Sequence, residues 1–382
     1  NLSGMHVVKA YAQEDAQISR FAALNEDFQA KSLALARMRG IVNPIMQGVS
    51  ALTVLIVIWY GGIRVMRGDL LVADIVAFIA YLNILAWPTA AFGWMLSLVE
   101  RGRAAMKRLD EILDAPPEIT GPPAPLRVRG LKSGVEFRKV SFAYGHSNNG
   151  HAALADVSFT LPVGKTVGLV GRIGSGKSTV AQLLPRLFDV SSGEILLDGQ
   201  DIRRLSLHEL RRMIGCVPQD PFLFSTSLRR NLTFGRDEVS DAEVERAVSI
   251  AKLDRDLEIF PQGIETIVGE RGVTLSGGQK QRATLARALV MDPPVLILDD
   301  CLSSVDAQTE AEILHGLKAI LREKTCLIIS HRISAVKEAD EILVLDGGRV
   351  IERGSHEQLI RHEGVYADLY RQQRLSEELE QI

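Results

Sequence analysis

A glycine-rich segment in the middle of the chain has the residue types that bind phosphate groups. Residues 171–178 read GRIGSGKS, between an apolar stretch and a predicted helix. Glycines let backbone N–H groups close around phosphate oxygens, and the first turn of a helix adds partial positive charge. In such a P-loop, Lys177 would reach the outer phosphates and Ser178 would bind Mg²⁺. The segment therefore predicts a site for a nucleoside triphosphate.

An apolar run further along the chain supplies a carboxylate for the same chemistry. The residues PVLIL precede Asp299 and Asp300, and such a run is typical of a buried strand. Mg²⁺ bound to a nucleotide has few protein ligands, and carboxylate and hydroxyl oxygens suit it. We therefore expect Asp299 to lie at the metal end of the nucleotide. These two features do not say which class of nucleotide enzyme the chain belongs to.

The sequence TLSGGQKQR at residues 274–282 narrows that choice, because residues 275–279 resemble the signature loop of ATP-binding cassette (ABC) proteins. Other segments resemble further elements of this family in the expected order: Tyr144 the adenine-stacking aromatic residue, Gln219 the Q-loop, GERG at 269–272 the X-loop, SSVD at 303–306 the D-loop, and His331 the switch histidine. The order of all these elements carries the resemblance, since each is a weak signal by itself.

The resemblance implies two nucleotide-binding domains that close head to tail around ATP and Mg²⁺. Each ATP would be held by the P-loop of one chain and the signature loop of the other. The implied ATP-binding residues are Tyr144, Gly171, Arg172, Ile173, Gly174, Ser175, Gly176, Lys177, Ser178, Thr179, Gln219, Ser276, Gly277, Gly278, Gln279 and Asp306. The implied metal ligands are Ser178, Gln219 and Asp299, and the implied catalytic residues are Asp300, His331 and Gln219.

The residue after Asp299 departs from the family pattern. Exporters that hydrolyse ATP at both sites generally have glutamate there, and this chain has Asp300. The missing methylene withdraws the carboxylate by about 1 Å, and a general base must lie within hydrogen-bond reach of its proton. In this respect the chain resembles the degenerate subunit of Mdl-type heterodimeric multidrug exporters, with a slow ATP site of its own. A homodimer in which Asp300 is an adequate base is the alternative.

Two uncharged segments, 41–63 and 75–99, are long enough to span a bilayer, because a spanning helix needs about 20 mainly apolar residues. A pair of buried core helices is the alternative. Arginines and lysines flank the outer ends of both segments, which favours cytoplasmic outer flanks. The resemblance to ABC exporters implies that the membrane is the inner (plasma) membrane of the cell. Residues 1–12 resemble a coupling helix of ABC exporters. The resemblance implies the last two helices of a six-helix membrane domain and a chain that is incomplete at its N-terminus.

These features predict an α-helical membrane domain fragment, followed by an α/β P-loop ABC ATPase domain with an antiparallel β subdomain and a helical subdomain. We expect residues 1–115 to form the partial transmembrane domain, 116–132 a Pro- and Gly-rich linker, and 133–382 the nucleotide-binding domain. The stretch after residue 355 has the pattern of one amphipathic helix that packs on the ATPase domain.

The resemblance implies ATP-driven export of a small molecule, lipid or peptide, as one half of a dimer with a second half-transporter, in contact with membrane lipid. A net charge of −3 gives no sign of a nucleic-acid partner. Three widely spaced cysteines suggest neither a disulfide framework nor a zinc site. Two other functions remain: a DNA-repair or translation ABC ATPase, which has no fused membrane helices, and a siderophore importer with the exporter architecture.

Overall fold

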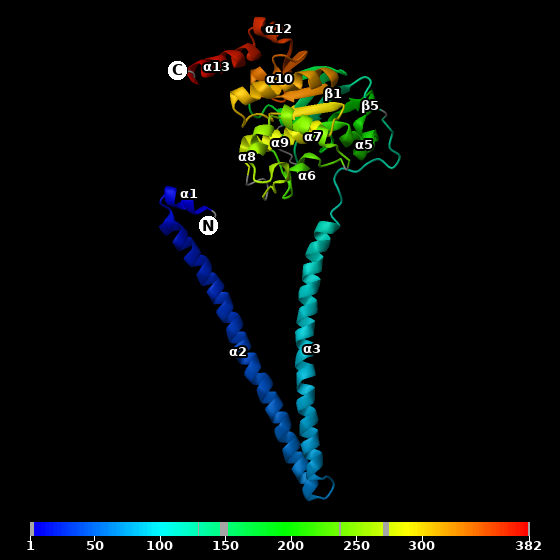
Figure 1. Ribbon diagram of the computed structural model, residues 1–382. Coiled ribbons are helices and arrows are strands. Elements are labelled where there is room, and N and C mark those ends of the chain that lie inside the picture. The colour runs from blue at the N-terminus through cyan, green and yellow to red at the C-terminus, as the bar shows by residue number, and fades with distance from the viewer. Residues whose placement is uncertain (1–3, 129, 146–151, 237, 270–274, 381–382) are drawn as a thin grey trace. The chain divides into compact units, whose positions relative to one another are not determined.

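The computed structural model describes residues 4–128, 130–145, 152–236, 238–269 and 275–380 (Figure 1). It divides into two compact units, Asn1–Pro116 and Pro117–Ile382. In its described residues, 4–116, the regular structure of the first unit is helical, and the second unit combines sheets and helices.

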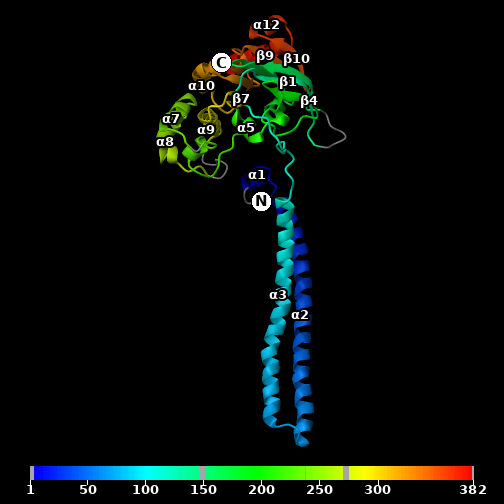
Figure 2. The same cartoon turned by 90° about the vertical axis from the view of Figure 1, so that its right-hand side faces the viewer.

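The first unit consists of a short helix, α1 (Met5–Ala10), and two long ones, α2 (Glu14–Met66) and α3 (Val72–Leu113). Helices α2 and α3 meet near the turn that connects them and diverge toward their other ends in the view of Figure 1, whereas the view of Figure 2 looks along the plane of this divergence. The most apolar window of each has a mean hydropathy of 2.0 and 1.8 respectively, and none of either window is buried within the protein. At about 1.5 Å per residue, α2 extends roughly 80 Å. Both helices are therefore long and apolar enough to cross a membrane, with helical turns to spare.

The second unit begins with an antiparallel sheet in the order β2-β1-β4-β5. Its strands are β1 (Val135–Phe142), β2 (Leu154–Leu161), β4 (Ser192–Leu197) and β5 (Gln200–Asp201). Along β2 most residues alternate between buried and accessible, which is the pattern of a sheet with one face against a core.

A six-stranded sheet in the order β10-β9-β3-β8-β7-β6 forms the centre of this unit. Its strands are β3 (Thr166–Gly171), β6 (Ile214–Val217), β7 (Val295–Asp299), β8 (Thr325–Ile329), β9 (Glu341–Asp346) and β10 (Arg349–Gly354). All pairs are parallel except β9 with β10. Successive residues of β7 enter different cores: Leu296 and Leu298 pack with the helices, while Val295 and Ile297 pack with the antiparallel sheet. Burial on both faces explains the uninterrupted apolar runs of these strands.

Helices cover the central sheet and extend beyond it as a helical subdomain. They are α4 (Lys177–Leu183), α5 (Leu207–Arg212), α6 (Leu228–Leu232), α7 (Asp241–Ile250), α8 (Asp254–Ile259), α9 (Gly277–Val290), α10 (Ala307–Glu323), α11 (Ile333–Val336), α12 (His356–Arg361) and α13 (Val365–Glu380). The predicted architecture, a helical part with two long helices followed by an α/β domain with an antiparallel β subdomain and a helical subdomain, is confirmed.

The end of the chain forms two helices, so the expectation of one amphipathic helix after residue 355 was wrong. Between α12 and α13, Glu363 has a φ of +54°, which an α-helix does not allow. The carboxylate of Glu352 accepts hydrogen bonds from the backbone N–H groups of Val365 and Tyr366, at 2.6 and 3.2 Å. A new helix therefore starts there with its own cap, which hydrophobic periodicity alone does not reveal.

Candidate nucleotide-binding site

Four of the predicted site segments gather at one edge of the central sheet. The P-loop follows β3, His331 follows β8, Asp299 ends β7, and Gln219 follows β6. These four strands are neighbours in the order β3-β8-β7-β6. Because the carboxyl ends of parallel strands meet at one edge, segments far apart in sequence come together, at the place where open α/β sheets bind ligands.

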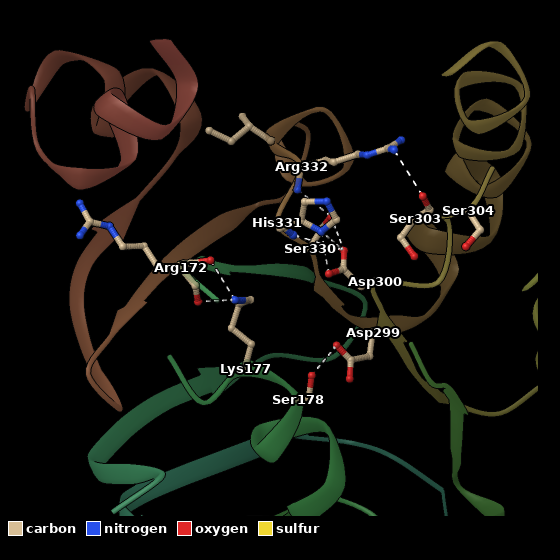
Figure 3. Close-up of polar contacts among 12 residues, drawn as sticks. Arg172, Lys177, Ser178, Asp299, Asp300, Ser303, Ser304, Ser330, His331 and Arg332 are labelled. Atoms are coloured by element: carbon tan, nitrogen blue, oxygen red, sulfur yellow. Dashed lines mark hydrogen bonds and ion pairs between the residues drawn. The ribbon is translucent and has the colours of Figure 1, made fainter. Parts of the chain in front are cut away.

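The P-loop has the backbone shape that its glycines predict. Gly176 has a φ of +99°, and a Cβ atom there would lie 2.4 Å from the carbonyl oxygen of Ala153. The Lys177 ammonium donates to the carbonyl oxygens of Gly171 and Arg172, at 2.8 and 2.9 Å (Figure 3). Burial lowers the pKa of Lys177, against the opposing effect of Asp300 and Asp299. The loop thus holds a buried cation at its centre.

Ser178 and Asp299 form a pair suited to a divalent cation. The Ser178 hydroxyl donates to Oδ1 of Asp299 at 3.3 Å (Figure 3). Burial raises the pKa of Asp299 to about 6, with a smaller contribution from Asp300. In the described part of the chain, no lysine, arginine or histidine forms an ion pair with Asp299. A buried carboxylate beside a hydroxyl, without an ion-pair partner, is the donor set that Mg²⁺ prefers.

Asp300 and His331 are in direct contact. Nδ1 of His331 lies 2.8 and 2.7 Å from the two carboxylate oxygens of Asp300 (Figure 3). Oδ1 of Asp300 also accepts from the Ser330 hydroxyl at 3.1 Å and from the His331 backbone N–H at 3.3 Å. Since an ionised carboxylate only accepts, Nδ1 of His331 carries the hydrogen. Asp300 has a φ of +47°, a conformation that aspartate tolerates better than most residues.

Tyr144 and Gln219 lie at the margins of this arrangement. The hydroxyl of Tyr144 is 3.1 Å from that of Thr179 and donates to Gln182 at 2.8 Å, so the half-exposed ring stands beside helix α4. Gln219 is exposed in the loop after β6. Among the described residues, no hydrogen bond joins Gln219 to Ser178 or Asp299.

The described part of the signature loop forms the start of α9. Ser276 caps this helix: its hydroxyl accepts from the Gln279 N–H at 3.3 Å, and its own N–H donates to the Gln279 side chain at 2.9 Å. The Gln279 amide nitrogen also donates to Asp256 at 2.9 Å. Both ends of the Gln279 side chain are therefore engaged within this chain. Thr274 and most of the predicted X-loop, 270–272, lie outside the described residues.

The signature helix and the D-loop are tightly joined. A Cβ atom on Gly278 would lie 2.9 Å from the carbonyl oxygen of Ser304. The buried Gln281 donates to the Ser303 hydroxyl at 2.9 Å and accepts from the Ser304 N–H at 2.8 Å. Asp306 ends the loop by capping α10, and the N–H of Thr309 lowers the pKa of its carboxyl. The two loops would therefore move together.

Several supporting residues were missed from the sequence. Ser330 binds Asp300, Gln281 joins two loops, and Asp256 pairs with Arg282 at 2.6 Å, both of the latter being mostly buried. Each is an ordinary polar residue on a helix or strand end, and its partner is far away in sequence. Of these residues, only Gln281 could have been recognised from the sequence, because it lies next to the signature loop.

The fold and the site together define a P-loop ATPase domain joined to membrane helices, and comparison with known families agrees. Residues 1–89 match the family described as "ABC transporter transmembrane region", and residues 154–303 match "ABC transporter". The chain therefore belongs to the ABC transporter family. The membrane match argues against the DNA-repair or translation ATPases, which lack such a region.

Within the family the chain is of the exporter type, with membrane and ATPase regions fused. It is 40% identical over 377 residues to the "Probable multidrug resistance ABC transporter ATP-binding/permease protein YheI" of Bacillus subtilis, covering 98% of this chain and 64% of that protein. It is 37% identical over 380 residues to the "Multidrug resistance-like ATP-binding protein MdlA" of Escherichia coli, covering 100% and 64%. A solved structure, a bacterial Atm1-family ABC exporter with ATP bound, matches with a TM-score of 0.85 and 35% identity, covering 97% and 65%. The chain thus spans slightly less than two thirds of the length of each of these relatives.

Proposed function

We propose that this chain is one half of a dimeric ABC exporter whose own ATP site turns over slowly. The dimer would use ATP to move a small molecule, lipid or peptide across the plasma membrane. The relatives named above for multidrug resistance support this class of activity. The observation that carries the finer proposal is Asp300, a short carboxylate already engaged by its neighbours.

The P-loop edge of the sheet would bind the nucleotide. Lys177 would exchange the carbonyl oxygens of Gly171 and Arg172 for phosphate oxygens, which carry more charge. Tyr144 would offer its exposed ring to adenine. Ser178 and Asp299, with Gln219 from the neighbouring loop, would hold Mg²⁺. When bound, Mg²⁺ neutralises the developing charge on the phosphates.

Asp300 would be a poor general base for two geometric reasons. Its carboxylate stands about 1 Å further back than that of glutamate, and a misplacement of that size is enough to cost about 100-fold in rate. Its oxygens also accept from Ser330 and from both N–H groups of the His331 residue in this structure. A water molecule would have to compete with these donors before Asp300 could take its proton.

The signature and D-loops would serve the partner's ATP. Ser276 and Gly277 lie at the N-terminal end of α9, which has 14 residues, so the helix dipole and exposed N–H groups suit a phosphate. The side chain of Gln279 is engaged with Ser276 and Asp256, so it would shape this loop more than touch the nucleotide. The proposed partner is a second half-transporter with glutamate at the position of Asp300.

Helices α2 and α3 would form the membrane-spanning part of the chain. Their apolar windows would lie in the bilayer, and the basic residues at their outer ends would face the cytoplasm together with the ATPase domain. Closure of two ATPase domains on ATP would favour one orientation of the membrane helices, because ATP binds the closed dimer more tightly than the open one.

ATP turnover of the full-length complex, purified with its native partner, tests the proposal. With Asp300→Asn, we expect turnover within about twofold of wild type, because hydrolysis belongs to the partner's glutamate. Asparagine keeps the side-chain size and tolerates the positive φ of this position. Asp346→Asn, on the exposed end of β9, is the matched control. A fall of about 100-fold or more would make Asp300 the working base and would support the homodimer instead.

A further inference from the structure

The loop that carries His331 is held by a residue from the C-terminal helix. Gln373 of α13 accepts a hydrogen bond from the Ile333 backbone N–H at 2.8 Å. Its side-chain nitrogen donates to the carbonyl oxygen of His331. One carboxamide therefore satisfies two backbone groups on either side of Arg332, as a rung of a sheet would.

Helix α13 is fixed at its N-terminal end, and Gln373 projects from the middle of the helix. Glu352 of β10 caps its first turn through Val365 and Tyr366. Tyr366 is fully buried in the core that packs on the sheet, and its hydroxyl is 2.8 Å from Nδ1 of His356. Gln373 follows Tyr366 by two helical turns, about 10 Å along the axis. Gln373 therefore contacts the loop from a helix whose N-terminal end is held in place by Glu352 and Tyr366.

The opposite side of the loop is held by the site itself. The His331 ring contacts Asp300, and the Arg332 guanidinium pairs with Glu310 of α10, whose side chain is 7% exposed. Ile333 is buried. The backbone of this loop thus lies between fixed groups on the catalytic side and Gln373 on the other. Without Gln373, the carbonyl of His331 and the N–H of Ile333 would lose these partners.

We propose that Gln373 is a positioning residue for His331, so that α13 sets how well this chain's own site distinguishes ATP from ADP. With the loop fixed, the His331 ring stays against Asp300 and its Nε2 keeps a constant direction toward the site. The γ-phosphate of ATP would meet Nε2 there, whereas ADP has no γ-phosphate. The effect on the preference for ATP over ADP rests on the proposed function. The two hydrogen bonds by which Gln373 holds the loop, here called the loop clamp, do not depend on that function.

Amide hydrogen exchange of the full-length complex without nucleotide tests the clamp. In Gln373→Ala we expect the Ile333 amide to exchange about tenfold faster, as the loss of two neutral hydrogen bonds predicts. Gln372→Ala is the matched control, because Gln372 is the same residue type, next on the same helix and exposed. Unchanged exchange at Ile333 in Gln373→Ala would overturn the clamp.

Competition by ATP and ADP against photolabelling of this chain with an azido-ATP tests the consequence. In Gln373→Ala we expect apparent ATP affinity to fall about tenfold, with ADP affinity within twofold of wild type. An equal loss for both nucleotides would mean that Gln373 supports only the fold and would overturn the positioning role. If Gln373→Ala does not fold, Gln373→Glu keeps the size and the Ile333 bond but not the donated one, and should lower the ATP preference too. Failure of the wild-type chain to bind either nucleotide would refute the proposed function, while hydrogen exchange would still decide the clamp.

Discussion

Replacing Asp299 by asparagine should stabilise the protein while it weakens Mg²⁺ binding. The folded protein raises the pKa of Asp299 to about 6, so the folded state holds this proton more tightly than the unfolded chain, where the pKa is about 4. Stability is therefore lost as pH rises from about 4 to about 6. A difference of about two pKa units corresponds to about 3 kcal/mol, fully expressed above pH 7. At pH 5 about half of this cost remains, because ionisation is incomplete.

Thermal unfolding of the ATPase domain within the full-length complex, without nucleotide and with EDTA, measures this effect. We expect the Asp299→Asn midpoint to lie about 5–10 °C above wild type at pH 8 and about half as far above at pH 5. With Mg²⁺ and ATP the order should reverse, because only the wild type gains binding energy. Asp346→Asn, at the exposed end of a strand in the same sheet, should change little. A variant that is no more stable at pH 8, or a gain that does not depend on pH, would refute the reasoning.

Two further substitutions test the contacts of the signature helix α9 with its neighbours in the chain. Gly278→Ala should lower ATP turnover of the complex about tenfold or more, because its Cβ would lie 2.9 Å from a D-loop carbonyl oxygen. Gly316→Ala is the control: its Cβ would make only ordinary contacts, the nearest at 3.7 Å, and turnover should not change. Asp256→Ala should lower the free energy of unfolding by about 3–5 kcal/mol, because Arg282 would be left mostly buried and unpaired; Asp254→Ala, exposed on the same helix, should change it by less than about 0.5 kcal/mol. Denaturation curves that coincide for the two aspartate variants would contradict the second prediction.

The sequence predicted those parts of the site that local rules determine. A P-loop needs its glycines at fixed spacing because Gly176 must adopt a positive φ, and Asp299 follows an apolar run because β7 is buried on both faces. The uncharged segments within α2 and α3 were also visible, since length and composition are enough to recognise them.

The contacts that set the behaviour of the site could not be predicted in this way. Asp300 meets Ser330 and His331 because β7 and β8 are neighbours, which is a property of the sheet order. The hydrogen bonds of Gln373 to the His331 loop depend on where α13 begins, and this start is set by a helix break at Glu363 and a cap from Glu352. Neither the break nor the cap changes the hydrophobic periodicity after residue 355, so this periodicity predicted a single helix.

The most direct test of the central claim is to trap ADP with vanadate in the full-length complex, using azido-ATP to label the chain whose P-loop holds it. Vanadate captures the nucleotide only at a site that hydrolyses. We predict that the label is found on the partner and is at least about tenfold weaker on this chain, where Asp300 replaces glutamate. Equal labelling of both chains, or a complex that contains only this chain and is labelled, would contradict the slow-site account.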